Sequence, residues 1–291
     1  MARGAGRSFV ALVAVGFIIE LGGGTMAALG LRTLARCYLA WPVGSRGSRP
    51  AACMEPIAGV GFHLFVPAII LVGVLCASIV LGGAHAVRSV HSAQRLEILL
   101  GPRVTDIPEE LSTAAEQAGS RAELRDHAAP YGVCIGIFSP RVAVSTALLR
   151  TLTPDELVAV LAHEERHRRR RAPLRRLVAR TTARALFYVP ILGDLSAAHV
   201  VEEEILADEE SCAVVGTRSL VKALAKLSGI DREGGAALAF GDASTLPYRL
   251  QAVREGRVAR PGPRRLSTAV SASSLFALFL LVLWMPVSGV H

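Results

Sequence analysis

Three long apolar segments constrain the fold of this chain more than any other feature of its sequence. They cover residues 9–31, 57–84 and 269–287, and a helix needs about 20 residues to cross a bilayer. Hydrophobic residues make up 52% of the chain and charged residues 19%, a balance between that of a water-soluble enzyme and that of a bundle of membrane helices. We therefore expect a chain divided between bilayer and water.

Arginines flank these segments unevenly and predict an orientation. Those near the ends of the segments are Arg3, Arg7, Arg88, Arg95, Arg254, Arg257, Arg260, Arg264 and Arg265. Because basic residues favour the cytoplasmic side, residues 1–87 are expected to form two transmembrane helices with a short extracytoplasmic loop. Residues 88–265 would then form a cytoplasmic domain, and residues 266–291 a third transmembrane helix whose C-terminus is extracytoplasmic.

The N-terminal part leaves alternatives open. Residues 9–31 could also be a cleaved signal peptide, although no clean cleavage site follows them. The loop at residues 32–56 holds four arginines of its own, which argues against placing it outside the cytoplasm. Cys37 and Cys53 would lie there in an oxidising compartment, where a disulfide is allowed but is not shown by their spacing.

The region after the second apolar segment mixes helix and strand signals. Residues 107–117 have helical spacing and stop before Gly119, a typical helix-ending residue. Alternating apolar residues predict two short strands, at 133–137 and 142–146. The sequence T-P-D-E at residues 153–156 then forms a helix start with a capping box. The fold class is therefore mainly α with a small β-sheet.

The helix that begins near residue 153 carries an H-E-x-x-H pattern. His163 and His167 are four residues apart, so both imidazoles lie on one face of the helix and can bind the same Zn²⁺. Glu164 lies between them and can act as a general base on the attacking water. The pattern predicts one zinc ion per chain, and a third protein ligand is still required.

A second helix, expected at residues 201–212, offers that ligand. Glu204 and Asp208 are one turn apart on it, so Glu204 can bind zinc while Asp208 orients an imidazole through its other nitrogen. Glu202 and Glu203 are close enough to compete as ligands. An acidic, solvent-exposed helix without a metal is the alternative interpretation.

These motifs resemble those of membrane-embedded gluzincin zinc metallopeptidases, the HtpX-type proteases and the BlaR/MecR-type antirepressor peptidases. The resemblance covers residues 108–254. Its motifs are a strand pair with Gly and Pro (136–142), a helix start (152–157), the zinc helix with a basic tail and a proline (163–174), E-x-x-x-D (204–208) and P-Y-R-L (247–250). Arg166 and Ala172 depart from the family pattern, and these departures bear on local packing more than on metal binding.

The resemblance implies a zincin-like metallopeptidase domain flanked by transmembrane helices. In such a peptidase the negative charge that develops on the substrate carbonyl needs a second donor. The candidates are Tyr188, His199, Arg218 and Arg249. A strand at the sheet edge, between residues 131 and 144, would bind an extended substrate by strand addition.

A run of nine arginines between residues 166 and 184 has two interpretations. Nucleic-acid binding is disfavoured because no aromatic residues accompany the arginines. A face held against anionic lipid headgroups is favoured. The apolar residues 185–201 that follow are expected to form a membrane-proximal helical hairpin, with a fourth transmembrane span as the alternative.

The sequence therefore predicts an integral protein of a bacterial cell membrane that hydrolyses peptide bonds of protein substrates on the cytoplasmic side. Its partners would be a protein or peptide substrate and the lipid bilayer, with no nucleic acid, and the oligomeric state stays open. The alternative is a catalytically weak or inactive signal transducer of the antirepressor type that keeps the peptidase fold. A transporter is disfavoured because the spans are few and no broken helices pair up.

Overall fold

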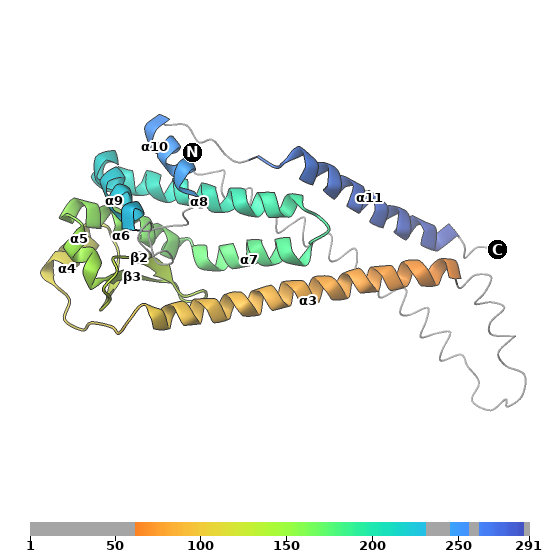
Figure 1. Cartoon of the computed structure of the whole chain (residues 1–291), viewed down its shortest axis with the longest axis horizontal. Helices are drawn as coiled ribbons and strands as arrows, with labels where there is room; N and C mark the ends of the chain where they lie inside the picture. The colour runs from red at the N-terminus through yellow and green to blue at the C-terminus, as the bar shows by residue number, and fades with distance from the viewer. Residues whose placement is uncertain (1–61, 231–244, 256–261, 288–291) are drawn as a thin grey trace, which may run out of the picture. The chain divides into compact units, whose positions relative to one another are not determined.

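The computed structural model describes residues 62–230, 245–255 and 262–287 (Figure 1). The predicted first apolar segment and the loop with Cys37 and Cys53 lie outside the described residues. In chain order the described elements are α3 Phe62–Leu99, α4 Glu109–Gln117, β1 Ala122–Arg125, β2 Gly132–Ile135, β3 Arg141–Ser145, α5 Thr146–Thr151, α6 Pro154–Arg169, α7 Ala172–Ala185, α8 Ile191–Val215, α9 Thr217–Ile230, α10 Leu246–Glu255 and α11 Arg265–Val287. The predicted fold class, mainly α with a small sheet, is confirmed.

The chain divides into two compact units. The sheet unit contains the described residues of His85–Arg180 and Asp194–Gly262. The apolar unit contains the described residues of Ala11–Ala84, Thr181–Gly193 and Pro263–His291. The division falls within α3, α7 and α8, so each of these helices has residues in both units.

The sheet has three strands in the order β1-β3-β2. β2 and β3 are antiparallel, with Cys134 opposite Val142, as the alternating pattern predicts. β1 is parallel to β3, with Leu124 opposite Val144, and was not predicted. Its four residues are too short for a clear alternation, and a parallel strand has no hairpin turn to mark it. β3 is the central strand, which leaves β2 as an edge strand.

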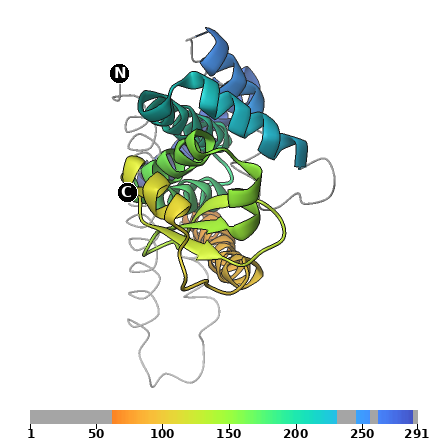
Figure 2. The same cartoon turned by 90° about the vertical axis from the view of Figure 1, so that its left-hand side faces the viewer.

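Helix α6 lies at the centre of the sheet unit. Figures 1 and 2 show the small sheet surrounded by helices, and α6 packs against β2, β3, α4 and α9. Every residue from Glu156 to His167 is buried, including the charged ones. The apolar core around α6 is formed by Leu111, Leu124, Val142, Val144, Leu148, Leu157, Val160, Leu161, Leu220 and Leu224, among others. The H-E-x-x-H pattern therefore lies inside the core.

Local signals in the sequence explain where α4 and α6 begin and end. The Thr153 N–H donates to Glu156 Oε2 at 2.9 Å, which forms the predicted capping box at the start of α6. Lys226 of α9 donates to the same carboxylate at 2.6 Å. Burial would raise the pKa of Glu156, but the hydrogen bonds from Lys226 and Thr153 keep it below its usual value. Gly119 has a φ of +62° just after α4, as expected for a helix-ending glycine.

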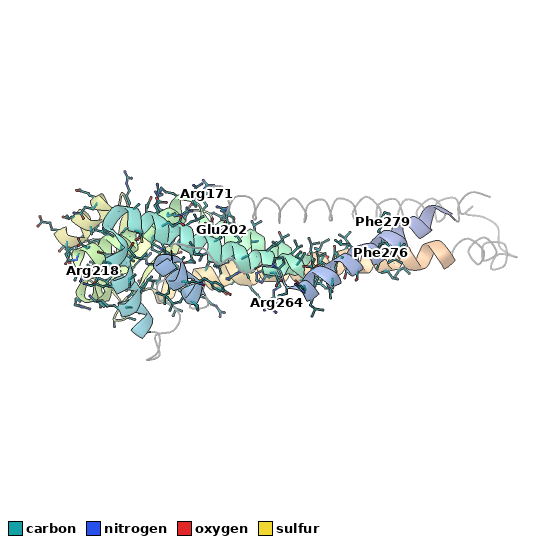
Figure 3. The ribbon with its side chains drawn as sticks, turned by 90° about the horizontal axis from the view of Figure 1, so that it is seen from above. Arg171, Glu202, Arg218, Arg264, Phe276 and Phe279 are labelled. Carbon is teal, nitrogen blue, oxygen red and sulfur yellow. The ribbon has the colours of Figure 1, made fainter. Side chains whose placement is uncertain are left out.

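The apolar unit contains parts of the two most apolar helices. The stretch Ile69–Leu99 of α3 is long and apolar enough to cross a membrane, and it is the one such stretch among the described residues. The predicted span ended at residue 84, whereas the helix continues to Leu99. The apolar part of α11 with described side chains is shorter, Arg265–Leu281. Figure 3 labels Phe276 and Phe279, two exposed aromatic residues on α11.

Residues 185–201 are divided between the end of α7, the connection to α8 and the first part of α8. α7 ends at Ala185, and α8 is one helix from Ile191 to Val215 that carries both the end of this segment and the predicted acidic helix. The tip between the helices, Thr181–Gly193, belongs to the apolar unit. There Ala185 approaches Gly82 of α3, and the Ile191 N–H donates to Ser271 Oγ of α11 at 3.0 Å.

Close packing of β2 on α6 makes Gly132 hard to replace. A Cβ atom at this residue would lie 2.6 Å from Val160 Cγ1, a distance that forces the strand and helix apart. We expect Gly132→Ala to lower the free energy of unfolding by about 1–3 kcal/mol, measured as a lower midpoint in thermal unfolding. In Gly193→Ala, where nothing lies within 4 Å of the new methyl group, the midpoint should not fall. An unchanged midpoint for Gly132→Ala would contradict this packing.

Candidate metal centre

Three side chains from α6 and α8 converge in the core of the sheet unit. His163 and His167 come from successive turns of α6, and Glu204 comes from α8. Their ligand atoms all lie within 4.8 Å of one another, and all three residues are buried. Among the residues that the structure describes, this is the one group of three or more histidine, cysteine and acidic side chains close enough to hold a metal ion.

The distances within this group fit a tetrahedral divalent metal. Zinc binds histidine nitrogens and carboxylate oxygens at about 2.0–2.2 Å, so two ligand atoms of one tetrahedron lie about 3.3 Å apart. The two Nε2 atoms of His163 and His167 are 3.1 Å apart. Glu204 Oε2 is 3.3 Å from His163 Nε2, and Glu204 Oε1 is 3.4 Å from His167 Nε2. The residues present therefore fit the ion that the sequence pattern predicts.

Asp208 lies behind His163, on the side away from the other two ligand atoms. Its Oδ1 is 2.9 Å from His163 Nδ1. A proton on Nδ1 that points to this carboxylate leaves the lone pair of Nε2 directed at the group of ligands. Asp208 is held in turn by Arg249 of α10, whose Nε and Nη2 donate to its two oxygens at 2.7 and 2.6 Å.

Glu164 lies between the two histidines in the sequence and is buried. Its carboxylate accepts a hydrogen bond from the backbone N–H of Cys134, which links it to the edge strand β2. Burial raises the pKa of Glu164 to about 7, with the charge of His163 opposing the rise and that of Glu204 adding to it. A carboxyl with such a pKa can accept and return a proton near neutral pH.

The surrounding charges set the protonation states of the three candidate ligands. Burial lowers the pKa of His167 to about 4, so its imidazole is neutral at pH 7. Burial would also lower the pKa of His163, but the carboxylates of Asp208 and Glu204 raise it. Burial would raise the pKa of Glu204, but Arg176 and the two histidines hold it well below its usual value. A neutral imidazole and an ionised carboxylate are the forms that bind metal.

Several members of the arginine run pair with acids. The pairs are Arg168 with Glu165, Arg169 with Glu210, Arg175 with Glu203, and Arg176 with Glu204. Arg175 and Arg176 are partly buried against acids of α8, so these two do not belong to one solvent-exposed face with the rest of the run. The spacing of the run did not reveal the pairs of these two α7 arginines, because their partners on α8 lie 28 residues away in the sequence. Arg171, between α6 and α7, is exposed (Figure 3).

The other residues predicted as charge-stabilising donors or competing ligands lie outside the group of His163, His167 and Glu204. His199 is buried on α8, and burial lowers its pKa to about 4. Arg218 is exposed at the start of α9 (Figure 3). Glu202 and Glu203, the competing ligands, are both buried but do not belong to the convergent group. Sequence reasoning missed Arg176 and Cys134 as neighbours of this site.

A comparison with family models identifies this region. The model of peptidase family M48 matches residues 101–244. These residues form a peptidase M48 domain. No curated protein and no solved structure matches the chain. The match includes His163, Glu164, His167 and Glu204 and ends just before α10. M48 peptidases are metallopeptidases, which agrees with the resemblance that the motifs indicate.

Asp208 should control metal affinity without binding the metal. Asp208→Asn removes the charge that orients His163, and loss of such an outer partner typically lowers metal affinity about 10–100-fold. Competition between the protein and a chelator of known zinc affinity measures this change. The control is Glu209→Gln, an exposed acid next to it on α8, which should bind zinc like the wild type. Equal zinc affinity in Asp208→Asn and the wild type would show that Asp208 does not orient the ligand.

Proposed function

We propose that the protein is a zinc-dependent endopeptidase anchored in a bacterial membrane, with its M48 domain in the cytoplasm. The observation that carries this proposal is the convergence of His163, His167 and Glu204 beside Glu164, inside an M48 domain. His163, His167 and Glu204 would hold one zinc ion. Bound there, the ion would polarise the scissile carbonyl and make water a better nucleophile at neutral pH.

Glu164 is the general base and then the general acid. It takes a proton from the water whose oxygen adds to the carbonyl carbon, and it gives that proton to the amide nitrogen as the C–N bond breaks. The backbone N–H of Cys134 fixes the carboxylate from the β2 side. Asp208 and Arg249 do not touch the substrate. Asp208 positions His163, and Arg249 holds Asp208.

The substrate is an extended segment of an unfolded protein or a loop. β2 is an edge strand, and the backbone N–H of Cys134 in its middle donates a hydrogen bond to the Glu164 carboxylate. A peptide added to this edge would be held by its backbone, close to the general base. Such recognition depends little on side chains, which suits a peptidase that acts on many unfolded sequences.

The character of α3 and α11 supports the membrane anchor. Only 17% of the most apolar window of α3 is buried, whereas a core helix of a soluble protein would be mostly buried. Exposed apolar residues of the two helices include Ile69, Ile70, Ile79, Val80, Leu81, Val87, Leu266, Val270, Leu275, Phe276, Phe279 and Leu280. Lipid tails are the environment in which such a surface is stable. The arginines near the helix ends favour a cytoplasmic M48 domain and an extracytoplasmic C-terminus.

The decisive experiment compares wild type and Glu164→Gln, purified in detergent. We expect about one zinc ion per chain in both, and cleavage of an unfolded protein that falls about 10²–10⁴-fold in the variant, the usual contribution of a general base. Exposed Glu110 on α4 supplies the control, since Glu110→Gln should cleave normally. Zinc without cleavage by the wild type would favour the antirepressor-type transducer. A wild-type protein that binds no zinc would refute the metallopeptidase.

The membrane anchor and its orientation have a separate test. The protein should stay with the membrane after an alkaline carbonate wash. Protease added to inverted membrane vesicles should digest the M48 domain, and protease added to right-side-out vesicles should leave it intact. Release by carbonate would contradict a transmembrane anchor, and the opposite protease pattern would reverse the proposed orientation.

A further inference from the structure

Arg176 is the arginine that faces the group of candidate ligands from α7. Its Nη2 pairs with Glu204 Oε1. Its charge also lowers the pKa of Glu164 and of Cys134, so the guanidinium lies close to the general base and to the edge strand as well as to Glu204. About a quarter of the side chain, 26%, is exposed. It is therefore next to the site and partly exposed to solvent.

The guanidinium of Arg176 has unused donors. Its Nε is buried and has no hydrogen-bond partner within the described part of the chain. A guanidinium carries five N–H donors in a fixed plane, and a buried donor without a partner is costly. A ligand oxygen that accepts from this group would satisfy it. This second observation points to an anionic or carbonyl oxygen beside Glu204.

The other basic candidates fit this role less well. Arg249 is 1% exposed, its Nε and Nη2 both donate to Asp208, and its Nη1 is 3.4 Å from Glu204 Oε2, so binding a substrate oxygen would compete with the pairs to both acids. His199 is buried, and its low pKa keeps it uncharged at neutral pH. Arg218 is exposed on α9 and has no interaction with the candidate ligands that the structure describes.

We propose that Arg176 is a catalytic residue that binds the carbonyl oxygen of the scissile peptide and stabilises the negative charge that this oxygen gains when water adds to the carbonyl carbon. This inference rests on the proposed function and extends it. A charged donor held in place before the reaction is worth about 10²–10³-fold in rate. The partial burial of Arg176 strengthens its interaction with a developing charge.

Arg176 should weaken metal binding, because its positive charge lies next to a metal ligand. The effect of its removal on zinc affinity therefore distinguishes a catalytic role from a structural one. Arg176 and a divalent cation both interact with the negative charge of Glu204, so the arginine opposes the metal electrostatically. If Arg176 is catalytic, its removal should leave zinc affinity unchanged or raise it, while transition-state binding falls. If Arg176 only holds Glu204 in place, its removal should lower zinc affinity.

The test uses Arg176→Gln, Arg176→Lys and the matched control Arg180→Gln, which removes one charge from an exposed residue one turn further along α7. Zinc affinity is measured by chelator competition. Binding of a phosphinic peptide, which mimics the tetrahedral oxyanion, is compared with binding of the uncleaved peptide of the same sequence in the Glu164→Gln background.

We expect Arg176→Gln to bind the phosphinic peptide about 10²-fold more weakly, with uncleaved-peptide binding unchanged and zinc affinity unchanged or higher. Arg176→Lys should recover part of the loss, and Arg180→Gln should match the wild type. Lower zinc affinity in Arg176→Gln, or equal losses for both peptides, would overturn the proposal. A wild-type protein without zinc or without cleavage would refute the proposed function itself, so the two failures are distinguishable.

Discussion

The structure depends on the compensation of several charges buried between α6 and α8. Transferring an ionised side chain from water to a protein interior costs several kcal/mol unless partners surround it. Glu204 is compensated by Arg176, by Arg249, whose Nη1 is 3.4 Å from its Oε2, and by two histidines, and Asp208 is compensated by Arg249 and His163. The two acids belong to successive turns of one helix, and both need arginines from other helices. This requirement explains why α7 and α10, which carry neither the H-E-x-x-H pattern nor E-x-x-x-D, are part of the site.

Burial of α6 from Glu156 to His167 also explains the position of the general base. Helices α4 and α9 and the sheet enclose α6, so Glu164 is largely removed from water. A backbone hydrogen bond to its carboxylate comes from the edge strand. The unit that excludes water from the base is therefore also the unit that presents a free strand edge to a peptide. A single packing arrangement serves both needs of a peptidase that acts on extended chains.

The sequence predicts features that depend on local spacing and misses those that depend on distant partners. The capping box at the start of α6, the end of α4 at Gly119 and the β2–β3 pair follow from a few neighbouring residues. β1 was not predicted, because its parallel pairing with β3 does not involve a hairpin turn that could be recognised in the sequence. Arg176 was missed because the run of arginines was interpreted as a face held against lipid headgroups, and its contact with Glu204 depends on how α7 packs on α8. The candidate metal site was predicted in part from local spacing. Helical spacing aligns His163 with His167 and Glu204 with Asp208, but the meeting of the two pairs depends on how α6 and α8 pack together.

Arg176 and Arg249 show how one residue type serves two purposes in a buried site. Arg249 is almost fully buried and uses two donors on one carboxylate, a geometry that fixes position at the expense of freedom. Arg176 keeps a donor without a partner and a side chain partly open to solvent. Holding Glu204 alone would favour the closed, bidentate geometry that Arg249 has. The open geometry of Arg176 is the one expected of a residue that waits for a second anion, and the carbonyl oxygen of a bound peptide becomes such an anion only during the reaction.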